Sequence, residues 1–238
     1  QNLVFASNHE TQDGTFDLYL MNVDQTQGGR AVTRLTNNNW DERHPAWNPV
    51  ATAPADRQIA VSARKANMQS PGGRAQPWNV FLMDRTGNYT HEVSALAGDG
   101  DNWAIESTWH PNGQLLAYTR FGPVVNYQSS SNKYQRIFVQ DLQASTSVIP
   151  LNVANTDPTS RESSPIWSTD RPNTLFFLKT EAAAPQLTRV NQTQYIPGNQ
   201  GNGFLSTPVL PFQGLQLPLT IVGGTNRDIS GYHPLDWR

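Results

Sequence analysis

A short segment that places a Trp or Tyr next to turn-forming residues recurs four times along this chain of 238 residues. Its copies are residues 44–49, 107–113, 164–170 and 231–236. An aromatic residue beside Pro, Asn, Asp or Gly is typical of a short strand that ends in a tight turn. Four copies of one pattern at a similar spacing predict a repeat protein.

Further strands follow each turn in a fixed order. Apolar second strands are expected at 3–7, 59–62, 116–119 and 175–178, and their starts are 56, 57 and 59 residues apart. Third strands are expected at 17–21, 79–83, 136–139 and, in a weaker form, 186–190. Last strands are expected at 31–36, 90–93, 147–151 and 217–222. Four strands per repeat in one order indicate the blades of a β-propeller.

Composition agrees with an all-β chain of short strands and turns. Charged residues make up 15% of the sequence, which also contains 17 Gly, 17 Pro and seven Trp, whereas no long helical pattern is visible. We expect a single domain over residues 1–238, because repeated blades share one architecture and no linker-like run divides them. The formal net charge of −2 gives no electrostatic reason to expect a nucleic acid as partner.

The sequence also gives an expectation for the cellular compartment of the protein. No apolar run approaches the ~18 residues of a membrane-spanning helix, so we expect no direct membrane span. The chain begins at Gln1 without a signal-peptide pattern, and we interpret this as a periplasmic or secreted protein whose targeting segment has been removed. The alternative is that the sequence starts inside a longer protein. Because the chain contains no Cys, disulfides, thiol catalysis and thiolate metal sites are excluded.

The phase of the repeat at the two ends predicts how a ring would close. If the aromatic strand is innermost in each blade, the chain starts at a second strand and stops just after an innermost strand near Tyr232. This last strand is expected to pair with residues 3–7 and to complete the first blade, which removes exposed sheet edges. We therefore predict a propeller of four four-stranded blades, closed by pairing of the N- and C-terminal strands. The alternative is a segment of a larger propeller.

The repeat also has a recognisable sequence pattern. Its best copy contains Leu-Thr at 35–36, the acidic residue Asp41, Pro-Ala-Trp at 45–47 and Asn-Pro at 48–49. With the strands at 4–7 and 18–22, this pattern resembles the repeat of TolB-type, WD40-like β-propellers over nearly the whole chain. The resemblance implies a propeller that serves as a binding module or an accessory domain.

We therefore expect a non-catalytic protein-binding or scaffold module of the periplasm or cell surface. Its partner is expected to be a protein, such as a membrane-protein complex of which this chain is a subunit or accessory. No nucleophile elbow, His-Glu-x-x-His pair or phosphate-binding Gly loop is present, so we expect no enzymatic activity. The alternative is a metal-dependent carbohydrate-active enzyme similar to the oligogalacturonide lyases with TolB-like propellers, or a carbohydrate-binding propeller.

In a propeller of this strand order, the long polar loops and the crossovers between blades share one face, where we expect function. Five carboxylates are expected just before successive innermost strands: Asp41, Glu42, Glu106, Glu162 and Asp228. Such a ring of oxygen atoms at the channel mouth suits Ca²⁺. The alternative, with no cofactor, is that these carboxylates accept hydrogen bonds from loop N–H groups or pair with Arg43, Arg161 and Arg227. His110 and His233 are expected to cap turns.

An uncharged insert at 192–212 breaks the symmetry of the fourth repeat. Large apolar residues in a surface loop point to a protein partner. The predicted partner-binding residues of the insert are Tyr195, Ile196, Phe204, Leu205, Val209, Leu210 and Phe212. Trp40 and Trp103, on two of the crossovers, are added to this surface. The alternatives are that the insert folds back over its own blade and that both Trp side chains pack between blades.

Overall fold

A computed structural model describes the chain at residues 2–11, 13–23, 31–50, 58–65, 77–94, 103–123, 133–142, 148–150, 161–171, 173–181, 184–195 and 204–205. Within these ranges the fold is all-β, as the sequence predicted, and no helix capable of crossing a membrane occurs in them. The strands are β1 (Asn2–Ser7), β2 (Asp17–Asn22), β3 (Val32–Arg34), β4 (Trp40–Trp47), β5 (Ile59–Lys65), β6 (Asn79–Met83), β7 (Tyr89–Glu92), β8 (Trp103–Trp109), β9 (Leu115–Pro123), β10 (Lys133–Asp141), β11 (Val148–Pro150), β12 (Arg161–Trp167), β13 (Thr174–Glu181), β14 (Ala184–Tyr195) and β15 (Phe204–Leu205).

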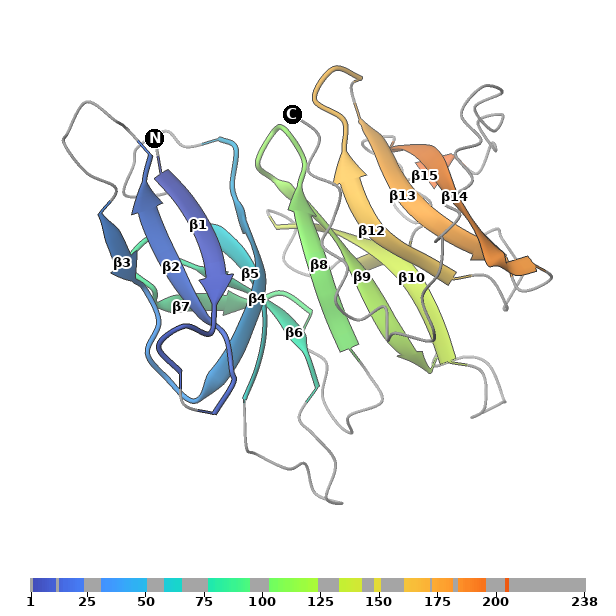
Figure 1. The fold of residues 1–238 in the computed structure, drawn as a ribbon. Helices are drawn as coiled ribbons and strands as arrows, with labels where there is room; N and C mark the ends of the chain where they lie inside the picture. Colours follow the sequence, from blue (N-terminus) through green and yellow to red (C-terminus); the bar gives the residue numbers. More distant parts are fainter. Residues whose placement is uncertain are drawn as a thin grey trace.

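The strands form three sheets that follow one another along the chain (Figure 1). The first has the order β1-β2-β3 and the second β4-β5-β6-β7, in both cases with antiparallel neighbours. The third combines β8-β9-β10-β11 with β12-β13-β14-β15. These two halves are joined by one parallel pair, Gln135 with Arg161. Four strands in the predicted order therefore occur in the β4–β7 and β8–β11 units, and the β1-β2-β3 sheet contains the last three strands of that order.

The first strands of the last three units start earlier than the sequence indicated. We expected Asp41, Glu42, Glu106 and Glu162 to precede these strands, and this expectation is wrong, because all four lie inside β4, β8 and β12. Polar residues and Pro suggested a loop at these positions. A β-bulge instead allows the strand to continue through them.

The bulge recurs at the same point of each of these strands. In β4, Arg43 is opposite Ser62 and Ala46 is opposite Ala60, so two residues of β4 face one residue of β5. His44, Glu106 and Ser164 are the first extra residues of the three bulges and have φ values of 51°, 57° and 51°. A bulge lacks one ladder hydrogen bond, which explains how Pro45 is accommodated within a strand.

Backbone hydrogen bonds join successive units at equivalent places. The Glu42 N–H donates to the Phe16 carbonyl at 2.8 Å, and the Ala104 N–H donates to the Trp78 carbonyl, also at 2.8 Å. In both cases the residue before a third strand bonds to the first strand of the next unit. The parallel pair between β10 and β12 repeats this contact once more. The units are thus connected by a recurring backbone contact as well as by side chains.

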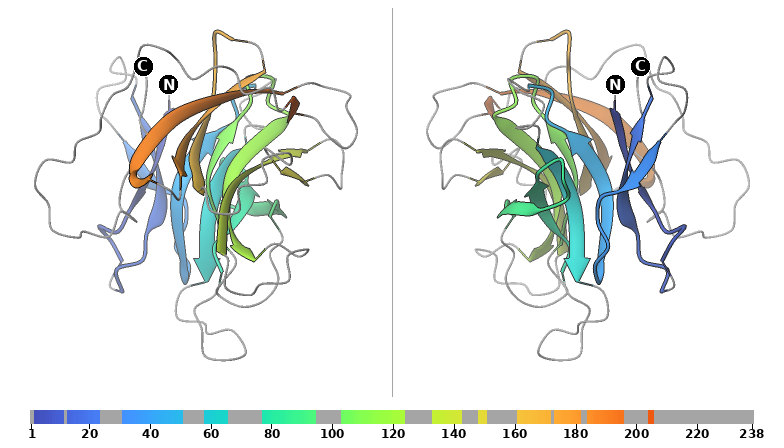
Figure 2. Two further views of the ribbon diagram at one scale, coloured as in Figure 1. Left: turned by 90° about the vertical axis from the view of Figure 1, so that its right-hand side faces the viewer. Right: turned by 90° about the vertical axis from the view of Figure 1, so that its left-hand side faces the viewer.

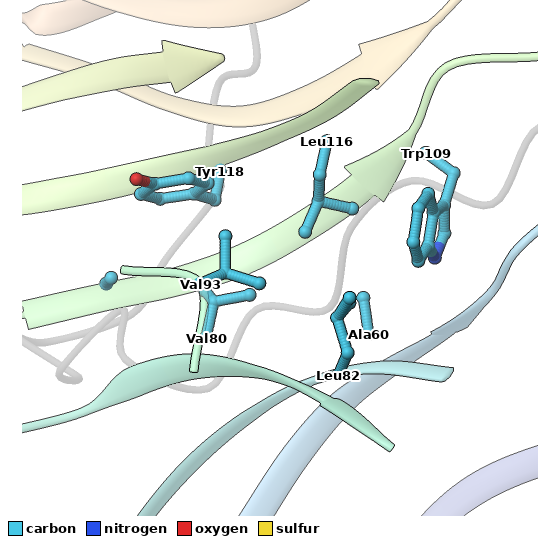
Figure 3. Close-up of a cluster of buried hydrophobic side chains, with 8 residues drawn as sticks. Ala60, Val80, Leu82, Val93, Trp109, Leu116 and Tyr118 are labelled. Atoms are coloured by element: carbon cyan, nitrogen blue, oxygen red, sulfur yellow. The ribbon is translucent and has the colours of Figure 1, made fainter. Parts of the chain in front are cut away.

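Three apolar cores lie between successive units. Figure 3 shows the second core, in which Val80 and Leu82 pack against Leu116, Tyr118 and neighbouring side chains. The first core joins the β1-β2-β3 sheet to the β4–β7 sheet, and the third joins the β8–β11 unit to the β12–β15 unit. Second strands such as β5 therefore bury both faces, which explains their nearly continuous apolar sequence. Figure 2 shows these units from two further sides.

The fourth unit differs from the prediction. Its third strand, β14, extends to Tyr195, and β15 pairs with it through Gln194–Leu205 and Tyr195–Phe204. The expectation of a loop is therefore wrong for 192–195 and 204–205, whose backbone forms an antiparallel ladder. The predicted last strand at 217–222 lies outside the described residues.

The first sheet has an open edge among the described residues. β1 is the edge strand of its sheet there, and the segment 231–236 lies outside them. Leu3 is 47% exposed, whereas the equivalent residues Ile59, Leu116 and Leu175 are fully buried beside their first strands. The first unit therefore has an uncovered apolar position where the other units have an inner strand.

Candidate functional site

The candidate site lies at one end of the sheets, where first strands begin and second strands end. Asp41 and Arg43 come from the start of β4, and Arg64 comes from the end of β5. Antiparallel pairing places Asp41 directly opposite Arg64. This is the end from which the long second-to-third-strand connections leave, and it corresponds to the face on which the sequence predicted function.

Asp41 binds two guanidinium groups. Its Oδ1 accepts from Arg43 Nε at 3.0 Å, and its Oδ2 accepts from Nη2 of the same side chain at 3.2 Å. Arg64 Nη2 donates to Oδ2 at 3.4 Å, and the Phe16 N–H donates to Oδ1 at 3.2 Å. The Asp41 side chain is 4% exposed, whereas those of Arg43 and Arg64 are 36% and 34% exposed. One buried carboxylate thus anchors two partly accessible cations.

Two aromatic rings hold the guanidinium groups. The Arg43 guanidinium lies 4.5 Å from the Phe16 ring centre and 5.5 Å from that of Trp78. Arg64 lies 4.7 Å from the Trp78 ring centre. Phe16 and Trp78 occupy equivalent positions before β2 and β6, so the repeat itself supplies both rings. Cation–π contacts of this kind contribute about 0.5–1 kcal/mol each at exposed sites. We call these five residues, Phe16, Asp41, Arg43, Arg64 and Trp78, the arginine–aromatic cluster.

The two Trp residues that the sequence assigned to a partner surface have different surroundings. Trp40 stacks on Tyr89 at 4.7 Å between ring centres and meets the Phe81 ring edge-on at 5.2 Å. Trp103 is 40% exposed, with its ring centre 5.5 Å from that of Phe121. Trp40 is therefore engaged in packing, whereas Trp103 leaves a large apolar surface accessible.

Glu42 lies in a buried polar network between the first two sheets. Its carboxylate accepts hydrogen bonds from Tyr89 Oη at 2.7 Å, Asn38 Nδ2 at 2.8 Å and Thr36 Oγ1 at 3.1 Å. Burial raises the pKa of the Glu42 carboxyl to about 7, although these three hydrogen bonds lower it; the nearby Asp17 raises it further. Burial, followed by the charge of Glu42, also raises the pKa of the Tyr89 hydroxyl, which stays a donor. Glu42 therefore titrates close to neutral pH.

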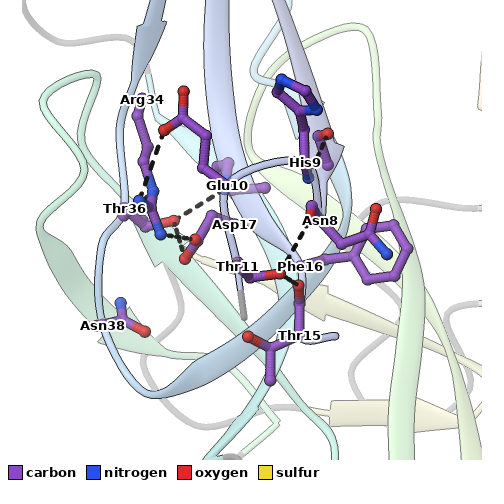
Figure 4. Close-up of polar contacts among 12 residues, drawn as sticks. Asn8, His9, Glu10, Thr11, Thr15, Phe16, Asp17, Arg34, Thr36 and Asn38 are labelled. Carbon is purple, nitrogen blue, oxygen red and sulfur yellow. Dashed lines mark hydrogen bonds and ion pairs between the residues drawn. The ribbon is translucent and has the colours of Figure 1, made fainter. Parts of the chain in front are cut away.

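Asp17 extends this network (Figure 4). It is fully buried and forms an ion pair with Arg34, whose other terminal nitrogen lies 3.6 Å from Glu10. Thr36 Oγ1 accepts the Leu18 N–H at 2.8 Å. The second sheet repeats this last arrangement, since Ser94 Oγ accepts the Val80 N–H at 3.0 Å. The recurrence identifies the hydroxyl as part of the repeat's framework.

The remaining predicted carboxylates lie apart from one another. Glu106 Oε2 accepts from Thr119 Oγ1 at 3.2 Å and from the Ser164 N–H at 2.9 Å, and so connects β8, β9 and β12. Glu162 is fully buried, with Oε2 3.4 Å from the Ile137 N–H. Asp228 lies outside the described residues. No three His, Asp or Glu side chains within the described ranges come together as metal ligands. Asp41, Glu42, Glu106 and Glu162 each accept hydrogen bonds, and Asp41 also pairs with Arg43 and Arg64.

His110 caps its turn as the sequence predicted. Its Nδ1 accepts the Asn112 N–H at 3.1 Å, so in the neutral ring Nε2 carries the proton and donates to Asn173 Oδ1 at 3.1 Å. The ring also contacts Trp167 edge-on at 4.6 Å. This histidine fixes the contact between two consecutive turns. His233 lies outside the described residues.

Few of the predicted insert residues can be located. Tyr195 ends β14, and Phe204 and Leu205 form β15. Ile196, Val209, Leu210 and Phe212 lie outside the described residues.

Sequence reasoning missed Phe16, Arg64 and Trp78. The signal that was available is their place in the repeat, because Phe16 and Trp78 both stand one residue before a third strand. Arg64 carried no motif, and its role depends on the pairing of β4 with β5.

Comparison with known proteins adds no assignment: no protein-family model matches the chain, and no curated protein matches it significantly.

Proposed function

We propose that this chain is a TolB-type β-propeller that acts as a non-catalytic protein-binding module in the periplasm or at the cell surface, as a subunit or accessory of a larger envelope assembly. The observation that carries the proposal is the arginine–aromatic cluster on the loop-bearing end of a repeated scaffold. Arg and Trp are the residue types that dominate binding energy at protein interfaces. A scaffold fixed by recurring hydrogen bonds holds such groups in place at low entropic cost.

The proposed ring contains four blades. The segment around Tyr232 supplies the innermost strand of the first blade and pairs with β1. Two observations support this closure: β1 is an edge strand among the described residues, and Leu3 is exposed where its equivalents are buried. The competing proposal is a larger propeller, in which a strand from elsewhere covers Leu3.

The surroundings of the described carboxylates favour binding over catalysis. Asp41 is engaged by two guanidinium groups, Glu42 by three donors and Glu106 by groups from two neighbouring strands. These contacts give each carboxylate a role in the scaffold. A carbohydrate-active enzyme or carbohydrate-binding propeller is the second proposal, because an exposed Trp such as Trp103 also suits stacking on a sugar ring.

The binding role is tested by cross-linking and co-purification of the tagged protein from envelope fractions of its source. Trp103→Ala should reduce recovery of a specific partner, while Trp40→Phe, which retains an aromatic ring in the stack, should not. Equal recovery by native protein and Trp103→Ala would contradict the proposed face. Metal-dependent cleavage of an oligouronide would instead support the enzyme.

The 192–212 insert is proposed as a second contact with the partner. Because β14 and β15 pair through Tyr195 and Phe204, replacement of Ile196, Val209, Leu210 and Phe212 together by Ser removes apolar side chains of the insert without changing the register of that pair. The expected result is an unchanged thermal midpoint and weaker co-purification. A lower midpoint with full partner recovery would show that these residues belong to the blade itself.

A further inference from the structure

The arginine–aromatic cluster has more positive than negative charge. Asp41 supplies one carboxylate for the two guanidinium groups of Arg43 and Arg64. Lys65 follows in β5, with Nζ 5.4 Å from the Trp40 ring centre. Among the described residues, no other carboxylate pairs with Arg43 or Arg64. The cluster therefore has at least one uncompensated positive charge within the described part of the chain.

The donors of the cluster are fixed in direction. Arg43 is held by a two-point contact with Asp41 and lies over the rings of Phe16 and Trp78. A guanidinium has five N–H donors, and Asp41 uses two from Arg43 and one from Arg64. About a third of each Arg side chain remains exposed. A planar fork whose orientation is already fixed loses little entropy when it binds a carboxylate.

An exposed apolar surface adjoins the cluster. Trp103 begins β8, and the next residue, Ala104, donates its N–H to the Trp78 carbonyl. Trp103 therefore lies at the same end of the neighbouring sheet as the cluster and is 40% exposed. A ligand that fits both features carries a carboxylate followed closely by an apolar group.

We propose that Arg43 and Arg64 bind a Glu or Asp side chain of the partner's peptide, and that an apolar residue next to it covers Trp103. This inference rests on the proposed protein-binding function and gives it a chemical specificity. The charge excess selects an acidic segment, and the rigid fork selects a carboxylate over an amide. Binding weakens as salt concentration rises, because the guanidinium groups are partly exposed.

The test uses fluorescence anisotropy with the full chain and a labelled peptide, GSEFELSG, beside the matched amide peptide GSQFQLSG. The native protein should bind the Glu peptide at least tenfold more tightly than the Gln peptide. Arg64→Gln should remove this preference, and Arg64→Lys, which retains the charge but not the fork, should reduce it. Arg85→Gln removes the same charge from the turn at the opposite end of the second sheet and should leave binding unchanged.

The outcomes separate this site from the general function. Absence of Glu-peptide binding by the native protein, or equal affinity for both peptides, overturns the carboxylate site, as does unchanged binding by a folded Arg64→Gln protein. Preference for an oligogalacturonate over the Glu peptide overturns the choice of a peptide ligand. If the site fails while Trp103→Ala still abolishes partner recovery, the binding function stands without it. Failure of the carboxylate site together with unchanged partner recovery by Trp103→Ala contradicts the proposed function as well.

Discussion

Replacement of Glu42 by Gln should change the pH dependence of stability in a direction that the structure determines. Folding raises the pKa of this carboxyl from 4.5 to about 7, mainly by burial. The folded protein thus binds the proton more tightly than the unfolded chain does. The corresponding stabilisation is fully present below about pH 4.5 and is lost as the pH rises through about 7.

The magnitude follows from the size of the shift. The change from 4.5 to about 7, at ~1.4 kcal/mol per pKa unit, corresponds to roughly 3 kcal/mol of unfolding free energy. Gln at position 42 imitates the protonated side chain at every pH. Its oxygen accepts from Tyr89 and Asn38, while the hydroxyl of Thr36 can turn toward Asp17 Oδ1, 3.5 Å away.

The assay is urea unfolding of native protein and Glu42→Gln at intervals between pH 4.5 and 8. The difference in unfolding free energy should move in favour of the variant by up to about 3 kcal/mol as the pH rises. Glu92→Gln removes a carboxylate from an exposed position of β7 and serves as the control. Parallel curves for native protein and Glu42→Gln would refute the reasoning, because they would show that Glu42 titrates alike in both states.

Two further predictions concern contacts between units. Gly87 has φ +95°, and a Cβ at this position would lie 2.2 Å from the Leu35 carbonyl oxygen, so Gly87→Ala should lower the unfolding free energy by about 2 kcal/mol or more. Gly14 has φ +76° and open space around it, so Gly14→Ala should cost only about 1 kcal/mol of backbone strain. Equal effects of the two variants in urea unfolding would contradict the close packing at Gly87. Thr119→Val removes the hydroxyl that contacts Glu106 and the Ser164 N–H, and should cost about 1 kcal/mol; Thr33→Val on exposed β3 is the control, and an equal loss there would argue against this link.

Strand positions were predictable where the residues of the strand itself determine them. Second strands such as β5 and β9 are nearly continuous apolar runs between turns, and this pattern depends on burial of both faces. The first strands were placed too late, because His44-Pro45 and Ser164-Pro165 resemble turn residues when the bulge is unknown. A bulge is specified by the partner strand as well as by its own residues.

The candidate site was predictable only in its location. The loop-bearing face was inferred from strand order, and pairing of a carboxylate with Arg43 was named only as the alternative to an ion site. The participation of Arg64 requires the register of β4 against β5, and that of Phe16 and Trp78 requires the spacing between sheets. These relations join residues distant in sequence, and single-sequence patterns do not report them.

Closure of the ring is tested most directly by a cysteine pair at positions 3 and 232. By the repeat, Leu3 and Tyr232 correspond to Ile59 and Trp47, which are directly opposite in β5 and β4. Opposite residues in antiparallel strands have Cα atoms about 4.5–5.5 Å apart, within disulfide range, and the chain has no other Cys. The account predicts rapid formation of an intramolecular disulfide by Leu3→Cys/Tyr232→Cys under mild oxidation. The register control, Leu3→Cys/Gly231→Cys, should form it poorly, because position 231 points to the other face. Equal or absent intramolecular disulfide formation in the two variants would contradict a four-bladed ring closed by its termini.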